Sequence, residues 1–185
     1  MKIEDGKGKN GDMSVSLSQR GNVSAKTAPR QMYASRDDGL SFSAIYDDIT
    51  AVAGDFVAYL KNTSSTRMMF VGDLTVGAVN AAKWKIYFVT GTAAAGTLVT
   101  PTPTNKAKNI PAEAIAMSGD TPITGLTTVG QLSNFRSAAG ASWEEAFEGS
   151  LILGPGDAIA VEYDTGTTGL CEMDLHFHYE DIGAS

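Results

Sequence analysis

The feature that most constrains the fold of this chain is a regular alternation of apolar and polar residues near its C-terminus. Between residues 171 and 180 every second side chain is apolar, namely Cys171, Met173, Leu175, Phe177 and Tyr179. The positions between them are polar and include the only two histidines of the sequence, His176 and His178. Side chains of a strand point alternately to its two faces, so this segment predicts a β-strand with one buried face. An antiparallel sheet with its other face in solvent is the typical setting of such a strand.

Other parts of the chain repeat this strand pattern. Six further runs predict strands, at residues 40–46, 56–60, 69–76, 83–89, 151–153 and 159–163. Turn-forming residues separate them, and Gly154-Pro155-Gly156-Asp157 has Pro and Gly at the positions that a type II turn requires. With 20 glycines, 19% charged residues and no long helical pattern, the chain predicts an all-β sandwich. The jelly roll is the form that we favour.

The middle of the chain is less regular. Residues 91–97 favour a flexible loop, and Pro101-Thr102-Pro103 excludes an interior strand because Pro cannot donate to a strand ladder. Residues 112–117 fit either a short strand or one helical turn. Residues 142–147 predict a short helix, in which Ser142 and Glu145 form a capping box.

The first 39 residues differ in composition from the rest. They are polar and rich in Gly, Ser, Lys and Asn, so they cannot bury a core by themselves. We expect an extended N-terminal arm over residues 1–39 and one jelly-roll β-sandwich domain over residues 40–185. Residues 1–36 hold seven basic and three acidic residues, a net charge of +4, and the remainder holds seven and eighteen, a net charge of −11. A basic arm can pair with an acidic partner or with a neighbouring copy, and the alternative is a solvated tail.

The sequence also argues against membrane, secreted and disulfide-linked proteins. No apolar run approaches the roughly 18–20 residues that cross a bilayer. The opening residues lack the apolar core of a signal peptide. Cys171 is the only cysteine, whereas an intrachain disulfide needs two. We therefore expect a protein made in a cytoplasm, without crosslinks and without a membrane partner.

The two histidines are the best candidates for a metal site. His176 and His178 share one strand face beside Glu172 and Asp174, a spacing that can direct two imidazoles toward one metal. A third histidine is missing, and Glu180 follows too closely for the metal-binding pattern of the cupins. We therefore expect a polar face turned to solvent or to a neighbouring subunit, with no bound metal.

Nucleophilic and acid–base catalysis have little support. No serine lies in a Gly-x-Ser-x-Gly elbow, and Cys171 falls on the apolar face of its strand. The carboxylate pairs Asp37-Asp38, Asp47-Asp48 and Glu144-Glu145 are adjacent in sequence. On a strand the two members of a pair point to opposite faces, and in a loop both are ordinarily solvated. We expect no enzyme activity and no cofactor.

The sequence gives little support for a phosphate or nucleic-acid site and leaves a sugar-binding face as an alternative. The Gly- and Lys-rich residues 6–11 neither follow a strand nor open a helix, as a phosphate-binding loop must. The acidic body is also unsuited to nucleic acid. Trp84 and Trp143 could line a sugar-binding face, although the alternation around Trp84 favours a place in the core.

Short motifs along the chain resemble those of one family. They are Asp5-Gly6-Lys7-Gly8, Met13-Ser14-Val15, Asn62-Thr63-Ser64, Trp84-Lys85-Ile86-Tyr87, the Gly-Thr pairs at 91–92 and 96–97 with Thr100-Pro101, Leu153-Gly154-Pro155-Gly156-Asp157 and Tyr179-Glu180. In this order they resemble the jelly-roll auxiliary capsid proteins of tailed bacteriophages, known as decoration or cement proteins. The sequence departs from the family pattern at about 105–140.

The resemblance implies a virion protein on the outer surface of a phage head, made in the host cytoplasm, which stabilises the capsid. Its expected partners are the major capsid protein and further copies of itself, as a homotrimer, with no nucleic acid and no membrane. The arm residues expected to contact the assembly are Lys2, Lys7, Lys9, Val15, Leu17, Arg20, Lys26 and Arg30. The alternative is a phage tail or neck subunit or a host-glycan-binding knob, and a cupin-type metal-dependent enzyme is third.

Overall fold

The computed structural model describes residue 35 and residues 38–182, except for the side chains of Glu148 and Gly149. Nearer the N-terminus it describes the backbone of four short strands, β1 (Ile3–Glu4), β2 (Asn10–Gly11), β3 (Val15–Leu17) and β4 (Val23–Ala25). β1 pairs with β2 and β3 pairs with β4, both antiparallel.

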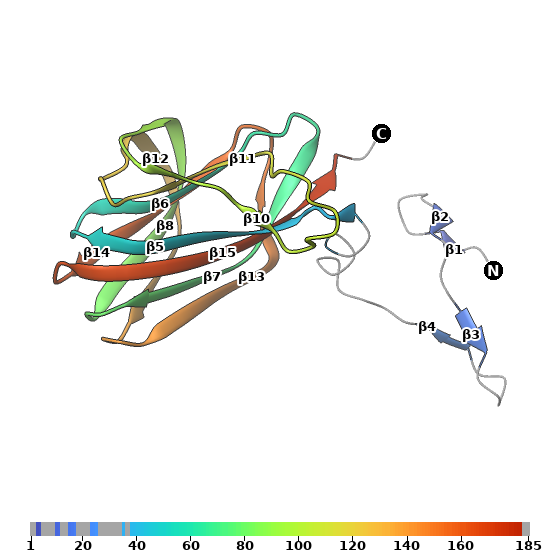
Figure 1. Ribbon diagram of the computed structural model, residues 1–185, viewed down its shortest axis with the longest axis horizontal. Coiled ribbons are helices and arrows are strands. Elements are labelled where there is room, and N and C mark those ends of the chain that lie inside the picture. The colour runs from blue at the N-terminus through green and yellow to red at the C-terminus, as the bar shows by residue number, and fades with distance from the viewer. Residues whose placement is uncertain are drawn as a thin grey trace.

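The body is a β-sandwich of two antiparallel sheets (Figure 1). The five-stranded sheet has the order β10 (Thr102–Pro103), β5 (Ser41–Ala51), β15 (Gly169–Asp181), β7 (Arg67–Ala78) and β13 (Ser142–Leu153). The six-stranded sheet has the order β12 (Thr124–Ser137), β8 (Ala82–Ala94), β14 (Ala158–Gly166), β6 (Asp55–Asn62), β11 (Ala114–Ser118) and β9 (Thr97–Val99). These two sheets confirm the all-β sandwich that the sequence predicts.

The core lies between the two sheets, where the apolar sides of the alternating strands meet. Phe177 of β15 stacks on Phe42 of β5 at 5.5 Å between ring centroids, and both side chains are fully buried. From the other sheet, Trp84 meets Tyr163 edge to face at 5.1 Å. The indole N–H of Trp84 donates to the Ser137 hydroxyl at 2.9 Å, so this buried polar group is satisfied. The expected core position of Trp84 is thus confirmed.

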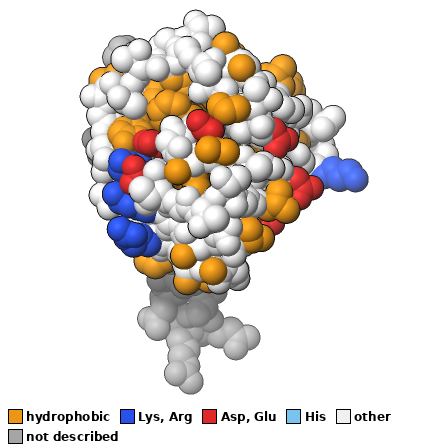
Figure 2. Space-filling view, turned by 90° about the vertical axis from the view of Figure 1, so that its left-hand side faces the viewer, with side chains coloured by type: hydrophobic (Ala, Val, Ile, Leu, Met, Phe, Trp, Pro, Cys, Tyr) orange, Lys and Arg blue, Asp and Glu red, His pale blue; other side chains and the backbone are white. Residues whose placement is uncertain are grey.

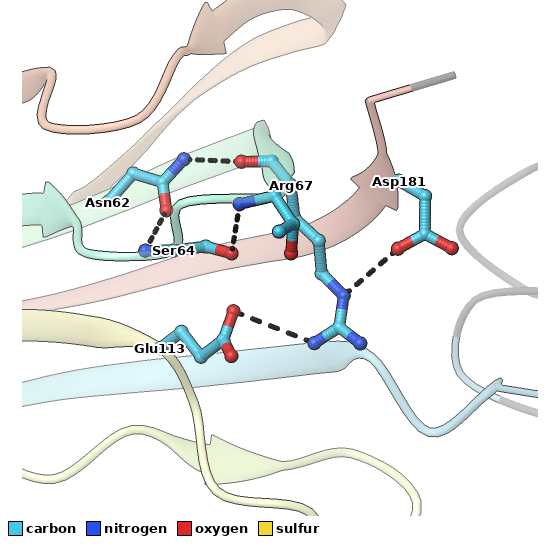
Figure 3. Close-up of polar contacts among 6 residues, drawn as sticks. Asn62, Ser64, Arg67, Glu113 and Asp181 are labelled. Carbon is cyan, nitrogen blue, oxygen red and sulfur yellow. Dashed lines mark hydrogen bonds and ion pairs between the residues drawn. The ribbon is translucent and has the colours of Figure 1, made fainter. Parts of the chain in front are cut away.

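A fully buried asparagine joins the turns at one end of the sandwich (Figure 3). The Nδ2 group of Asn62 donates to the carbonyl oxygens of Arg67 at 2.9 Å and of Leu153 at 3.0 Å. Its Oδ1 accepts the backbone N–H of Ser64 at 3.0 Å, which closes an Asx turn between β6 and β7. The Arg67 side chain then reaches Glu113 at 3.6 Å and Asp181 at 3.1 Å, so that β7, the segment before β11 and the end of β15 are tied together.

Two sequence-based predictions about turns are confirmed. Gly156 has a φ of 86°, and the N–H of Asp157 donates to the carbonyl of Gly154 at 3.1 Å, as in a type II turn. Residues 165–169, Thr-Gly-Thr-Thr-Gly, also predict a turn by their composition, and residues 167 and 168 of this segment connect β14 to β15. The Pro-flanked β10 lies at a sheet edge, where Pro is tolerated.

In the middle of the chain the structure contradicts two predictions and resolves one alternative. Residues 142–147 form the start of β13 and not a helix, because Ser142–Ala146 pair in register with Gly77–Asp73 of β7. The local capping-box pattern is weaker than this tertiary pairing. The expected loop at 91–97 is largely strand, since β8 continues to Ala94. Residues 112–117 fit either a short strand or one helical turn by their sequence, and the structure has a strand there, β11 (Ala114–Ser118).

Candidate functional site

A trough crosses the outer face of the five-stranded sheet. It consists of a cavity of about 400 Å³ and a neighbouring cavity of about 220 Å³, which share Asp47, Gly77, Ser142 and Glu172. Gly77 leaves room for the Glu172 side chain, because a Cβ at this position would lie 3.1 Å from the Oε1 atom of Glu172. The trough is therefore built by β5, β7, β13 and β15 together.

A β-bulge places two neighbouring carboxylates in this trough. Cys171 of β15 lies opposite Ile49 and Met173 lies opposite Tyr46, so Asp47 and Asp48 together face one residue of β15. Asp48 has a φ of 52°, and both aspartates are exposed and line the trough. The expectation that this pair points to opposite faces is wrong, because the bulge interrupts the alternation of the strand.

The trough combines acidic and apolar groups. Its carboxylates are those of Asp47, Asp48, Glu172 and Asp174, and none of its lining residues is Lys, Arg or His. Its rim includes three exposed aliphatic side chains, Ile45, Val79 and Leu170. Such a surface is complementary to lysine and arginine, which have an apolar stem and a cationic end.

The two sides of the sandwich differ in how their edge strands are protected. On one side the edges are β9 and β10, only 3 and 2 residues long, with prolines at 101 and 103. On the other side the edges are β12 and β13, which are 14 and 12 residues long. Long exposed edges can pair with another chain, and stable proteins usually shorten or cover them. Within the described residues, the β12–β13 side is therefore the side with long edge strands, and we call it the open side.

Bulges in β12 turn apolar side chains outward. Gly125, Val129 and Leu132 are the residues of β12 that have no partner in the register with β8, and the side chains of Val129 and Leu132 are 67% and 37% exposed. A bulge redirects the side chain of its extra residue. On β13, Trp143 is 45% exposed and stacks on Phe135 at 6.2 Å, while its indole N–H donates to Glu145 at 3.4 Å. The open side thus presents aliphatic and aromatic surface.

The end of β8 and most of β12 carry no charge. Residues 86–105 and 121–135 contain no Asp, Glu, Lys, Arg or His, although the chain from residue 37 onward has a net charge of −11. In Figure 2 the upper part of the molecule, on the side where Figure 1 labels β12, shows neither acidic nor basic side chains. Basic side chains gather along the left-hand edge of this view, another projects at its right, and acidic ones lie across its middle.

A compact ion-pair cluster lies on the outer face of the six-stranded sheet. Asp164 of β14 accepts hydrogen bonds from the Nζ groups of Lys85 and Lys83, the latter at 3.0 Å. These hydrogen bonds, Lys85 first, hold the pKa of Asp164 below its ordinary value, and the bond with Asp164 raises the pKa of Lys85. Both lysines pair with the same carboxylate of their own sheet, and we assign the cluster a structural role.

The histidines are held by neighbouring side chains of the fold. The Nδ1 atom of His176 lies 2.7 Å from the Oδ1 atom of Asp73, and this side chain is 37% exposed. The ring of His178 stacks on Phe70 at 5.3 Å and is buried, and its Nε2 lies 3.5 Å from Glu180. The expectation that both imidazoles face solvent or a neighbouring subunit is therefore wrong for His178, because Phe70 of the same chain covers it. Among the residues that the structure describes, no group of three or more His, Cys, Asp and Glu side chains is arranged to hold a metal.

Of the other residues singled out in the sequence, Cys171 and two arm residues lie within the part of the chain that the structure describes. Cys171 is buried on the core face, as expected, and burial raises the pKa of its thiol to about 12. Val15 and Leu17 lie in β3, opposite Ala25 and Val23 of β4. The other predicted arm contacts, Lys2, Lys7, Lys9, Arg20, Lys26 and Arg30, lie outside the described residues. No helix within the described ranges is long and apolar enough to span a membrane.

Comparison with models of protein families, with curated proteins and with solved structures gives no match to this chain. The fold and its surfaces define the class, which is an antiparallel β-sandwich protein with one open edge and an acidic trough.

Proposed function

We propose that this chain is a structural protein of a viral particle, a jelly-roll decoration or cement protein that binds the outer surface of a phage head and stabilises it. Its partners in this proposal are the major capsid protein and further copies of the chain, as a homotrimer. It works by docking and not by catalysis, needs no cofactor, and acts on the capsid surface after synthesis in the host cytoplasm.

The observation that carries the proposal is the nested order of the strands. The eight long strands pair first with last and inward from there: β5 with β15, β6 with β14, β7 with β13 and β8 with β12. β15 also pairs with β7, and β14 with β8, so the nested hairpin is divided into two sheets. Eight strands in two Greek keys define a jelly roll, an architecture of viral capsid proteins, lectins and cupins. The nested order thus supports the fold that the sequence resemblance implies.

The charges support a docking role for the arm. The first 36 residues carry a net charge of +4, and the trough on the body presents carboxylates with no cation among them. In a capsid lattice the arm of one copy can reach the body of the next, where lysines and arginines meet Asp47, Asp48 and Glu172. Exposed ion pairs contribute only about 0–1 kcal/mol each, so backbone pairing and apolar contacts of Val15 and Leu17 carry most of the affinity.

The test is to bind the purified protein to capsids that lack it. Removal of residues 1–36 should abolish co-sedimentation with the capsid and leave the melting temperature of the body nearly unchanged. A matched variant, with Lys2, Lys7, Lys9, Arg20, Lys26 and Arg30 replaced by Gln, should bind more weakly, as should the intact protein in high salt, since both remove only the smaller electrostatic contribution. Full occupancy by the truncated body would contradict the docking role of the arm.

A glycan-binding knob is the second candidate, and one observation favours it. Trp143 presents a half-exposed indole beside Glu145, and Ser133 bonds the same carboxylate at 2.8 Å, so a stacking face and acceptor oxygens lie together. Titration of host surface glycans against the intrinsic tryptophan fluorescence separates the two functions, because Trp84 is buried and only Trp143 would respond. Saturable binding that Trp143→Ala abolishes would favour the glycan role.

A further inference from the structure

The outer edge of β12 is unused in the fold. β12 is the last strand on its side of the six-stranded sheet, so within the described part of the chain only one of its edges is paired, with β8. This strand is 14 residues long, and most of it is exposed on both faces. An edge of this length ordinarily carries lysine, proline or a covering segment, whereas residues 121–135 provide no charge and a single proline at 122, before the strand begins.

The low charge of β12, whose one charged residue is Arg136 near its end, decides what kind of partner can approach it. From residue 37 onward the chain has a net charge of −11, so two copies repel each other over most of their surfaces. Where β12 meets the end of β8, residues 121–135 and 86–105 hold no charged side chain at all. The upper part of Figure 2, on the side where Figure 1 labels β12, shows neither acidic nor basic side chains. Apart from Glu145, whose carboxylate accepts a hydrogen bond from Ser133, this is therefore a surface on which two acidic copies can meet with little repulsion between carboxylates.

The bulges of β12 supply apolar side chains at the same place. Val129 and Leu132 lack partners in the register with β8, and each exposes an aliphatic side chain to solvent. Leu98 is more exposed, at 74%, yet it lies on the 3-residue edge strand β9 at the opposite side of the same sheet. A long edge with 12 consecutive uncharged residues, 124–135, and redirected apolar side chains coincide, within the described residues, only on the β12 side of this sheet.

We propose that the β12 edge is the surface through which this chain binds a second copy of itself, with the edge strands side by side and with Val129 and Leu132 in the contact. Backbone pairing provides the directional part of the contact, and the two aliphatic side chains lose their exposed area. This inference deepens the proposed assembly role by assigning the self-contact to one strand. Self-association is measured on the purified protein alone. A monomeric protein that still binds capsids would refute only this inference, and an oligomer that does not bind capsids would refute only the proposed function.

The experiment measures the size of the full-length protein by sedimentation velocity over a range of micromolar concentrations. The unmodified protein should form an oligomer. The double variant Val129→Glu, Leu132→Glu places like charges in the contact and should weaken association at least about 30-fold, which leaves a monomer in this range. The matched control is Leu98→Glu, the same chemical change at an exposed edge residue of the same sheet, and it should keep the oligomer intact.

The melting temperature of each variant shows whether the fold is retained, and it should be nearly unchanged because all three side chains are exposed. If the double variant does not fold, hydrogen exchange of the unmodified protein replaces it, and amides of β12 should exchange more slowly in concentrated than in dilute solution. A monomeric unmodified protein, an oligomer that survives the double variant, or equal dissociation by Leu98→Glu would each overturn the inference.

Discussion

Replacement of Asn62 by alanine tests whether one buried side chain holds the turns at this end of the sandwich. Asn62 is fully buried and makes three side-chain hydrogen bonds, to the carbonyls of Arg67 and Leu153 and from the N–H of Ser64. Alanine removes all three bonds and leaves their partners without the side chain of residue 62. Two of these bonds, those with Leu153 and Ser64, lie in buried surroundings, where water cannot replace the lost partner.

The expected loss of stability follows from those two buried groups. An unsatisfied buried backbone group costs about 1–3 kcal/mol, so the pair predicts a loss of about 4 kcal/mol in the free energy of unfolding. For a chain of this size each kcal/mol lowers Tm by roughly 2–4 °C, which corresponds to a fall of roughly 8–16 °C. Asn62→Asp keeps the shape and one acceptor oxygen but turns a carboxylate toward two carbonyl oxygens, so it should be at least as harmful as Asn62→Ala.

Urea unfolding followed by circular dichroism measures these values. The matched control is Asn80→Ala, because Asn80 also bridges to carbonyls across a turn, those of Thr167 and Thr168 at 3.4 and 3.2 Å, but at an exposed site. It should change stability by less than about 1 kcal/mol. The reasoning is refuted if the two alanine variants differ by less than about 1 kcal/mol, or if Asn62→Asp is tolerated.

Two further predictions concern titrating groups. Since burial raises the pKa of Cys171 to about 12, its thiol should be unreactive toward an aromatic disulfide reagent at pH 8 in the folded protein and react fully in denaturant; rapid reaction in the native state would contradict this placement. The folded-state pKa of Asp164 is lowered by Lys85 and Lys83, so its stabilising contribution is complete above its ordinary value of 3.8 and is lost as the pH falls through the lower folded-state value. Asp164→Asn should therefore reduce stability at neutral pH and flatten the acid limb of the unfolding curve, and an acid limb as steep as that of the unmodified protein would count against this assignment.

Regular alternation made most of the sandwich predictable from the sequence. The apolar residues of β15 recur with a period of two because one face of this strand is buried, and the position of Cys171 in the core follows from this period. In β14, Ile159, Val161 and Tyr163 follow the same period, although Ala158 and Ala160 on the other face are buried as well. β12 gives no such signal, because an edge strand that is exposed on both faces can carry Thr, Gly, Ser and Gln throughout. Residues 142–147 were misleading for a related reason: β13 is the other edge, Trp143 is only half buried, and a local helix pattern was not opposed by a clear alternation.

Both candidate surfaces arise where the alternation of a strand is interrupted. In β5 the bulge at Asp47 and Asp48 turns two adjacent carboxylates into one trough, which a regular strand would place on opposite faces. In β12 the unpaired positions at Val129 and Leu132 turn aliphatic side chains outward on a strand that has no other reason to expose them. A prediction from strict alternation assigns such residues to the wrong face. One extra residue in a strand reverses the face of every position that follows. The residues that hold the fold together are therefore those that the period predicts, and the residues that we assign to assembly are those at which it fails.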